Sequence, residues 1–382
     1  MKKIHLLLLL FFTVQIAFSQ VDYKTIFSEK LGEERELKIQ LPRGYADSDN
    51  KRYPLIVVFD GDYLFEPVAG NVDYYSYWDD MPEAIVVGIN QLDKRYDDSL
   101  YSEQNSLPIE TGVSFFEFVG MELMPYLEKN YRIENFKMAI GHGETANFIN
   151  YYLLKGEPLF QGYVVLSPDL APDMLNYIPE KLQKVQSKIF YYLASSKNDI
   201  NHIKAATVSL NAEIGKLENK NILYNYFDFE NPTHYAVPAY AIPDALMKIF
   251  LVYQPISKNE YKETILKLQS SPVVYLEEKY QTIKDLFGIE KQILVNDFKA
   301  ISAAIEKNEQ FQHYEALGKL ARKAYPDAIL GSYYLARFYE ETGEPKKAMK
   351  TYQSAYVLEE LGGITKDLVL EKAEEIKADF GY

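Results

Sequence analysis

Cysteine is absent from all 382 residues of the chain. Its absence excludes disulfides, thiolate metal sites, a cysteine nucleophile and a lipid-modified N-terminal cysteine. Any catalysis must therefore use oxygen or nitrogen groups.

Positive charge is also scarce, because 41 Lys and Arg residues stand against 55 Asp and Glu, which gives a net charge of −14. A surface with this balance repels phosphate backbones and anionic bilayers, so we expect no nucleic-acid partner. The five histidines show no HExxH or paired spacing. Phosphate-loop and dinucleotide motifs are missing as well, and we expect neither a metal nor a cofactor.

Long apolar runs are missing after the first residues of the chain. Those first residues contain two lysines, an apolar run from Leu6 to about Ile16, and then Ala17-Phe18-Ser19. This order is typical of a signal peptide, and the run is shorter than the ~18 residues that favour a membrane span. We predict that residues 1–19 are removed and that the mature protein is periplasmic or extracellular, with no membrane span. A retained N-terminal anchor is the alternative.

Short β-rich runs alternate with helical stretches over residues 20–256. The alternation predicts a doubly wound, mostly parallel α/β sheet whose functional residues lie at the carboxyl ends of the strands. The clearest predicted strands are Leu55–Phe59, Ala84–Ile89, Lys137–Ile140, Gly162–Leu166, Ile189–Ala194 and Leu223–Phe229. Helical spacing of apolar residues predicts helices over Ser114–Tyr131 and Thr145–Lys155.

The remainder, residues 257–382, is helical in period and propensity. Its segment SYYLARFYEETGEPKKAMKTYQSAYVLEE places small and aromatic residues at the offsets of a tetratricopeptide-type hairpin, with Tyr339 and Tyr352 among them. We predict one good repeat with weaker flanking helices, both tyrosines being internal. Because helical repeats bury their faces against neighbours, this domain is expected to pack on the sheet domain or on a protein partner.

The segment KMAIGHGETANFINYYLL joins a short apolar strand to an amphipathic helix through a glycine-rich corner. In a nucleophile elbow this strand, turn and helix read G-x-S-x-G, and the turn presents the serine hydroxyl. Here the frame reads Gly141-His142-Gly143-Glu144-Thr145. The nucleophile position is therefore occupied by Gly143, which has no hydroxyl.

Several segments of the chain resemble the putative-esterase family of α/β-hydrolases and follow one another in the order found in that family. The family includes enterochelin-esterase-like and S-formylglutathione-hydrolase-like enzymes. The resemblance covers about residues 36 to 252 and is carried by YPLIVVFDGDYLF, PEAIVVGINQLDKRYDD, LPIETGVSFFEFVGMELMPYLEKNYR, the elbow, FQGYVVLSPDL and NPTHYAVPAYAIPDALMKIF. It implies that His234 is the general base, with Asp199 as the acid that orients it. It also implies an oxyanion hole of backbone N–H groups at Glu144 and at Asp62 or Tyr63.

Three functions remain open on this basis. The first is a non-catalytic binding or assembly protein, because losing the nucleophile typically costs about 10⁶ in rate. The second is an ester hydrolase that uses Glu144, Thr145 or His142, or a water activated by His234. In either case the expected ligand is small and ester-like.

The third function is a carbohydrate-binding or carbohydrate-active protein. Its candidate residues are Tyr74, Tyr75 and Trp78, in a chain with 33 tyrosines and one tryptophan. Aromatic rings of this kind stack on sugars, although they also fill ordinary half-buried positions.

Overall fold

The computed structural model describes residues 21–382. Its centre is an eight-stranded sheet in the order β1-β2-β4-β3-β5-β6-β7-β8. The strands are β1 (Val21–Ser28), β2 (Glu33–Gln40), β3 (Tyr53–Val58), β4 (Ile85–Ile89), β5 (Ile133–His142), β6 (Gly162–Leu166), β7 (Ile189–Asn198) and β8 (Ile222–Thr233). The first two strands are antiparallel to their neighbours, and the other six run parallel to one another. The predicted signal peptide, residues 1–19, lies outside the described residues.

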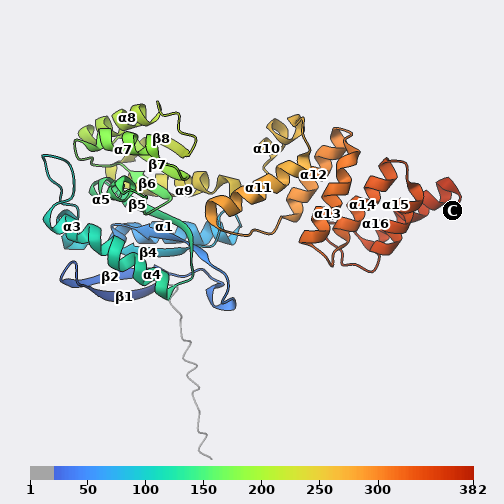
Figure 1. Cartoon of the computed structure of the whole chain (residues 1–382), viewed down its shortest axis with the longest axis horizontal. Helices are drawn as coiled ribbons and strands as arrows, with labels where there is room; N and C mark the ends of the chain where they lie inside the picture. The colour runs from blue at the N-terminus through green and yellow to red at the C-terminus, as the bar shows by residue number, and fades with distance from the viewer. Residues whose placement is uncertain (1–20) are drawn as a thin grey trace, which may run out of the picture.

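Helices cover both faces of the sheet (Figure 1). One face packs against α1 (Gly61–Tyr77) and α9 (Val237–Ile249). The other packs against α3 (Glu110–Glu117), α4 (Met124–Asn130), α5 (Glu144–Phe148), α6 (Asn150–Leu154), α7 (Met174–Lys184) and α8 (Asn201–Ile214). Successive residues of β3 alternate between these two cores, as a strand buried on both faces requires. The predicted doubly wound α/β fold is confirmed.

All six predicted strands are present, and most extend beyond their predicted ends. The antiparallel hairpin β1–β2 was not predicted, because its strands carry charged residues such as Glu34, Arg35 and Lys38 between their apolar ones. The predicted helix over Ser114–Tyr131 corresponds to α3 and α4 joined by a π-helical turn, Phe118–Leu123.

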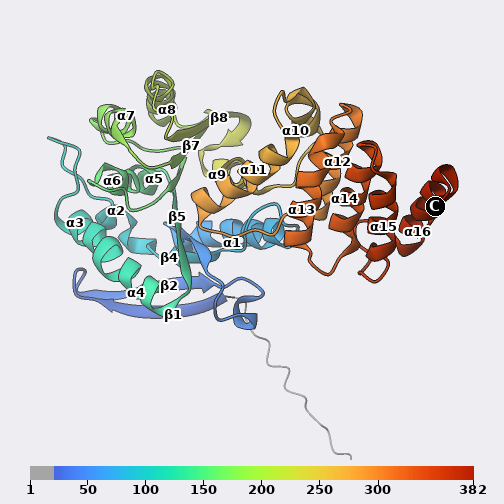
Figure 2. The ribbon, with the colours of Figure 1, turned by 45° about the vertical axis from the view of Figure 1, so that its right-hand side comes forward.

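The chain beyond Ser257 folds into helices α10 (Lys258–Glu263), α11 (Pro272–Phe287), α12 (Val295–Lys307), α13 (Tyr314–Ala324), α14 (Ile329–Glu341), α15 (Pro345–Ala355) and α16 (Lys366–Phe380). They follow one another in a row that leads away from the sheet (Figure 2). Tyr352 is fully buried, whereas Tyr339 is only half-buried, with the Lys347 ammonium 5.4 Å from its ring centre. We call this row of helices, residues 258–380, the helical arm.

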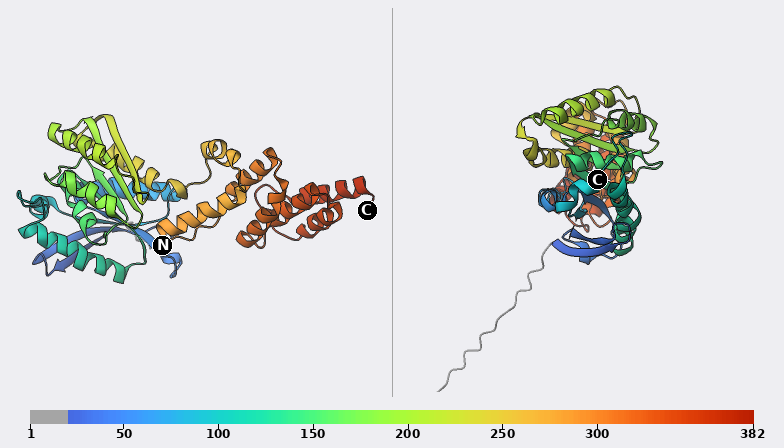
Figure 3. Two further views of the ribbon diagram at one scale, coloured as in Figure 1. Left: turned by 45° about the horizontal axis from the view of Figure 1, so that its top comes forward. Right: turned by 90° about the vertical axis from the view of Figure 1, so that its left-hand side faces the viewer.

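The arm shares its core with the sheet. Phe287 of α11 packs against Phe136, Phe190 and Phe250, with ring centres 5.0, 5.8 and 5.0 Å away. At the same junction Lys291 donates to Asp79 (2.8 Å) and to the carbonyl of Tyr253 (2.9 Å). Figure 3 shows the arm projecting from one side of the sheet. Among residues 21–382, no helix has the length and apolar character that a membrane crossing needs.

Candidate functional site

The strand-to-helix corner predicted as a nucleophile elbow is formed by the end of β5 and the start of α5. Gly143 has φ 61° and ψ −119°, a conformation that side-chain-bearing residues adopt only under strain. A Cβ atom at Gly141 would lie 2.6 Å from the carbonyl oxygen of Thr145, so this position needs glycine. The backbone of a nucleophile elbow is therefore present without the nucleophile.

His234 and Asp199 form a buried dyad beside this corner. Nδ1 of His234 lies 2.8 Å from Oδ1 of Asp199, and the hydroxyl of Ser167 donates to Oδ2 of Asp199 at 2.6 Å. Burial raises the pKa of Asp199, but the hydrogen bonds from His234 and Ser167 outweigh it, and the net pKa is lowered. An ionised Asp199 fixes the proton of His234 on Nδ1 and leaves Nε2 as the atom that can accept a proton.

The dyad is within reach of the missing hydroxyl. A Cβ atom built on Gly143 would lie 3.6 Å from Nε2 of His234, a separation that a serine Oγ could bridge by a hydrogen bond. The same Cβ would lie 3.2 Å from a terminal nitrogen of Arg95. The guanidinium thus borders the space in which a nucleophile would stand.

Arg95 is held at this place by three partners. It donates to Oδ1 of Asp60 (2.7 Å), to the carboxylate of Glu144 (2.5 Å) and to the backbone carbonyl of His142 (2.8 Å). These bonds use three of the five N–H groups of a guanidinium, and Tyr63 is a further polar neighbour. Arg95 therefore brings hydrogen-bond donors next to Gly143, with its charge paired to two carboxylates.

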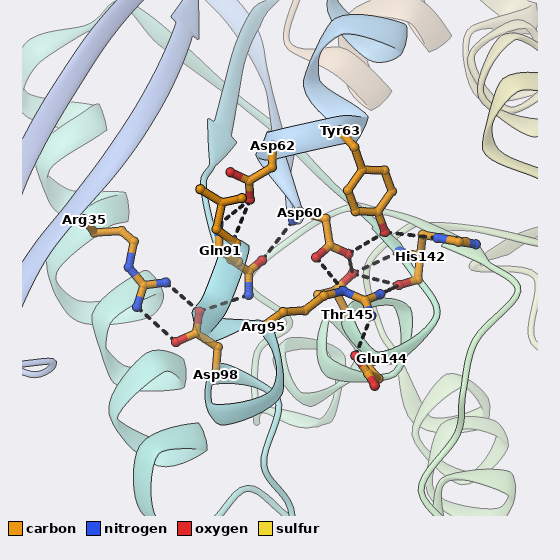
Figure 4. A network of polar contacts seen from close by, with 11 residues as sticks. Arg35, Asp60, Asp62, Tyr63, Gln91, Arg95, Asp98, His142, Glu144 and Thr145 are labelled. Carbon is orange, nitrogen blue, oxygen red and sulfur yellow. Dashed lines mark hydrogen bonds and ion pairs between the residues drawn. The ribbon is translucent and has the colours of Figure 1, made fainter. Parts of the chain in front are cut away.

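A polar network holds Asp60 beside the corner between β5 and α5 (Figure 4). The hydroxyl of Thr145 donates to Asp60 at 2.6 Å, and the hydroxyl of Tyr63 lies 3.0 Å from Asp60 and 3.1 Å from Nδ1 of His142. Burial raises the pKa of Asp60 despite the opposing charge of Arg95. Thr145 is fully buried and committed to this network, which argues against it as a replacement nucleophile.

The same polar network extends from Asp60 to Arg35 of β2. Gln91 accepts from the backbone N–H of Asp60 at 2.9 Å and donates to Asp98 at 3.1 Å. Asp98 pairs with Arg35 through bonds of 2.5 and 3.0 Å. All four side chains are at least nine-tenths buried, so the network fixes the loops after β3 and β4 that carry Asp60 and Arg95.

His142 lies against His234, with ring centres 4.5 Å apart. Burial, followed by the charge of His234, lowers the pKa of His142 to about 3. The ring is therefore neutral at pH 7, and its Nε2, 3.1 Å from the carbonyl oxygen of His234, must carry the proton because a carbonyl only accepts. His142 supports the backbone of His234 and lies in the interior, as expected for the position before a nucleophile.

A cleft opens in front of this group. One lobe of about 400 Å³ is lined by Tyr63, Arg95, Gly143, Glu144, Asp169, Ile200, His202, Ile203, His234 and Tyr235. A second lobe of about 230 Å³ shares Glu144 and Asp169 with the first and continues to Tyr96 and Tyr101. The cleft therefore mixes tyrosine rings with charged groups of both signs.

The predicted oxyanion donors lie around this corner. The backbone N–H of Tyr63 donates to the carbonyl of Asp60 at 3.1 Å, within the first turn of α1. The carboxylate of Asp62 accepts from the backbone N–H groups of Gln91 (2.7 Å) and Leu92 (2.8 Å). The backbone N–H groups of Glu144 and Asp62 therefore remain the predicted donors of the oxyanion hole.

The predicted aromatic group is not part of the cleft. Tyr74, Tyr75 and Trp78 lie at the end of α1 opposite to Tyr63, about 20 Å away at 1.5 Å per residue. Tyr74 and Trp78 are 60% and 61% exposed. In residues 21–382, no three or more His, Asp and Glu side chains gather as a metal site would require.

Several residues of the site were not predicted individually. Asp60 and Arg95 lie in segments that resemble the esterase family, but only the fold brings Arg95 beside Gly143 and pairs it with Asp60. Ser167, which holds the second oxygen of Asp199, has φ 43° at the end of β6. Its signal in the sequence is the Ser-Pro pair after that strand.

Comparison with solved structures finds chains that are similar over most of this protein. An uncharacterised protein from Capnocytophaga ochracea DSM 7271 is 31% identical over 94% of this chain and 100% of its own, with a TM-score of 0.85. An IroE-like serine hydrolase from Shewanella oneidensis is 20% identical over 79% of this chain and 99% of its own (TM-score 0.58). The siderophore hydrolase EstA from Aspergillus nidulans is 13% identical over 62% and 96%, with a TM-score of 0.53. No curated protein matches the chain.

The last two structures share the fold with this chain at identities too low to carry a substrate across. The model of the family described as "Putative esterase" matches residues 28–213, a range that includes the elbow, Arg95 and Asp199. His234 lies beyond this range, but it completes the dyad that the fold places beside the elbow. The chain belongs to this esterase family of α/β-hydrolases.

Proposed function

We propose that the protein is a non-hydrolytic member of the esterase family that binds a small ester-like ligand in the cleft above Gly143. One observation carries this proposal: an intact elbow and dyad surround a residue that cannot form an acyl-enzyme. Loss of the nucleophile in a triad costs about 10⁶ in rate, whereas binding and the backbone donors survive it.

The groups around Gly143 suit recognition of an acyl group. Arg95 brings hydrogen-bond donors to this space and is held there by its bonds to Asp60, Glu144 and the carbonyl of His142. Nε2 of His234 faces the same space, since its other ring nitrogen is bound to Asp199. A carbonyl or carboxylate oxygen placed there would receive hydrogen bonds from a site that needs little rearrangement, which favours affinity.

The second candidate is hydrolysis by a water that His234 activates. It is favoured by the preserved dyad, in which the lowered pKa of Asp199 keeps that carboxylate ionised to support an imidazolium. In this reaction Nε2 of His234 would take a proton from water while the water oxygen bonds to the ester carbon. The bond from that carbon to the alkoxy oxygen would then break, and the imidazolium would return the proton to the departing alcohol. Glu144 is a poor alternative because its carboxylate is paired with Arg95.

An assay with p-nitrophenyl acetate separates the two candidates. The binding proposal predicts that the wild-type protein and His234→Ala release p-nitrophenol at the same rate as an equal concentration of a protein without such a dyad. Turnover that is abolished by His234→Ala, and reduced by Asp199→Asn with the fold intact, would instead establish the water mechanism.

The aromatic end of α1 supports a third candidate, carbohydrate binding. Tyr77 and Trp78 form an edge-to-face pair with ring centres 5.1 Å apart, and both are 61% exposed. Because Trp78 is the one tryptophan of the chain, its fluorescence reports on this end of α1 alone. A glycan that shifts this emission in the wild type but no longer binds Trp78→Ala would favour this candidate.

Export and a protein partner complete the proposal. The N-terminal sequence favours export, and the helical arm offers a surface on which a protein could dock, as helical repeats do. Secretion of a tagged full-length chain into the periplasm or medium, with loss of residues 1–19, tests the first. A pull-down with the full chain, compared with a variant in which the exposed arm residue Val357 is replaced by aspartate, tests the second.

A further inference from the structure

Strand β1 is an open edge of the eight-stranded sheet. It pairs with β2 on one side, from Asp22 opposite Ile39 to Ser28 opposite Glu33. On its other side, the backbone of Asp22 through Phe27 forms no hydrogen bond with any residue of the described range 21–382. Figures 1 and 2 show β1 as the outermost strand, with no element beyond it. Such an edge presents N–H and C=O groups that are arranged to pair with another strand.

One face of this edge carries exposed aromatic rings. Tyr23 and Phe27 are 60% and 61% exposed, and Thr25 lies exposed between them on the same face. The strand contains no proline, and Asp22 and Lys24 carry opposite charges that offset one another. Proteins usually blunt an open edge with proline, a bulge or charged side chains, and of these devices β1 has only Lys24 and Asp22, which pair with one another at 3.4 Å.

The sequence of β1 is self-complementary about Thr25. If two copies pair antiparallel with Thr25 facing Thr25 of the second copy, Tyr23 of each copy faces Phe27 of the other. Asp22 then faces Ser28, and Lys24 faces Ile26. Both aromatic pairs fall on the exposed face, and cross-strand pairs of this kind contribute roughly 0.2 to 1 kcal/mol each. Threonine pairs are also favourable on a sheet surface.

We infer that β1 is a dimer interface, in which two copies of the chain join their sheets about a two-fold axis through Thr25. The contact is isologous, as in most homodimers, and closes without leaving a free β1 edge. It lies on the sheet edge far from β8 and does not involve the cleft above Gly143, so it is independent of the proposed ligand binding.

Charge sets the conditions for this dimer. Each copy carries a net charge of −14, so two copies repel one another at low ionic strength. Added salt screens charges separated by more than the Debye length, which is about 10 Å at 0.1 M, while the paired backbone groups at the interface are little affected. The dimer is therefore expected to become tighter as salt rises from about 50 to 300 mM.

The register can be tested at Thr25 by sedimentation equilibrium of the full chain. In a monomer a lysine at this position lies beside Glu36 of β2, which is a favourable neighbour. In the dimer it would face a second lysine directly, and like charges opposite one another are destabilising. We expect the dimer of Thr25→Lys to be at least fivefold weaker than that of the wild type, and Thr25→Val, which keeps the branched shape, to match the wild type.

A mixture of two oppositely charged variants provides the decisive test. Thr25→Glu should also weaken self-association, whereas an equimolar mixture of Thr25→Lys and Thr25→Glu should dimerise at least as tightly as the wild type. Far-UV circular dichroism checks that each variant is folded. A wild type that stays monomeric at 300 mM salt and 100 µM protein would overturn the inference, and so would a dimer that Thr25→Lys and Thr25→Glu leave unchanged.

Discussion

The imidazole of His142 is enclosed by Tyr63, His234 and the backbone of the elbow. Its Nε2 lies 3.1 Å from the carbonyl oxygen of His234 and its Nδ1 lies 3.1 Å from the hydroxyl of Tyr63, so both ring nitrogens already have a hydrogen-bond partner. Burial and the nearby His234 lower its pKa from the usual 6.5 to about 3. His142 is therefore a structural residue at this position and does not act as a base.

This environment predicts an acid-dependent loss of stability. Between pH 6.5 and about 3 the unfolded chain binds a proton at His142 that the folded chain does not bind, so stability falls as the pH drops through this window. The full effect is at most about 5 kcal/mol at 1.36 kcal/mol per pKa unit. The urea midpoint at pH 7 and pH 4.5 should therefore differ less in His142→Gln than in the wild type. Equal differences in the two proteins would contradict the proposed role.

The elbow, β5 followed by α5, shows how two glycines in one motif serve different purposes. At Gly141 an added Cβ would meet the backbone of Thr145 at 2.6 Å, and this contact cannot relax without moving the helix. At Gly143 the nearest atoms are the ends of the Arg95 and His234 side chains, at 3.2 and 3.6 Å, but φ is positive. The first glycine is required by packing and the second by backbone conformation.

We expect this difference to appear in stability. Gly143→Ala should cost about 1 to 3 kcal/mol, the usual strain of a side-chain-bearing residue in such a conformation. Gly141→Ala should cost more, because backbone atoms must separate by several tenths of an ångström. Urea unfolding of both variants measures the order. A Gly141→Ala variant as stable as Gly143→Ala would show that the elbow is less tightly built than its geometry indicates.

The elements of the sheet were largely predictable, and their sequence signals explain which ones were not. Strands buried on both faces, such as β6, are continuous apolar runs and are found with correct bounds. The hairpin β1–β2 alternates charged and apolar residues, and its partner β4 is far away in sequence. The elbow and the dyad followed from the family resemblance. The position of Arg95 did not, because it depends on how Asp60, Glu144 and the β5 backbone meet in three dimensions.

Across the whole molecule, the sheet and the helical arm share one apolar core. Phe287 of the arm is fully buried among Phe136, Phe190 and Phe250, which belong to the sheet unit. Lys291 and Asp79 add a hydrogen-bonded ion pair at the same junction, in which the lysine side chain is 5% exposed. The division predicted at residue 256 lies between α9 (Val237–Ile249), which covers the sheet, and α10 (Lys258–Glu263), the first helix of the arm.

This shared core predicts that the two parts unfold together. Phe287→Ala should destabilise the whole chain by about 3 to 5 kcal/mol, as loss of a buried aromatic ring usually does. Calorimetry should show one transition in the wild type and in the variant. Phe380→Ala, which removes a phenylalanine that is 58% exposed, is the matched control and should change the midpoint little. Two separate transitions in the wild type would show that the arm is an independent domain.

The central claim is that the cleft is a complete esterase site except for one hydroxyl. Gly143→Ser supplies that hydroxyl on a Cβ atom that would lie 3.6 Å from Nε2 of His234. Gly143→Ala is its control, since it has the same backbone strain and the same contact with Arg95 but no nucleophile. A third variant, Gly143→Ser with His234→Ala, removes the base.

The most direct measurement is the initial rate of p-nitrophenyl acetate hydrolysis by these three folded variants. We expect Gly143→Ser to be at least tenfold faster than Gly143→Ala. The gain is set this low because Arg95 could displace the serine hydroxyl, and a displacement of about 1 Å can lower the rate roughly 100-fold. The gain should disappear in Gly143→Ser/His234→Ala. A folded Gly143→Ser protein that is no faster than the other two variants would contradict the account, because the base and the acyl site would then not be in working geometry.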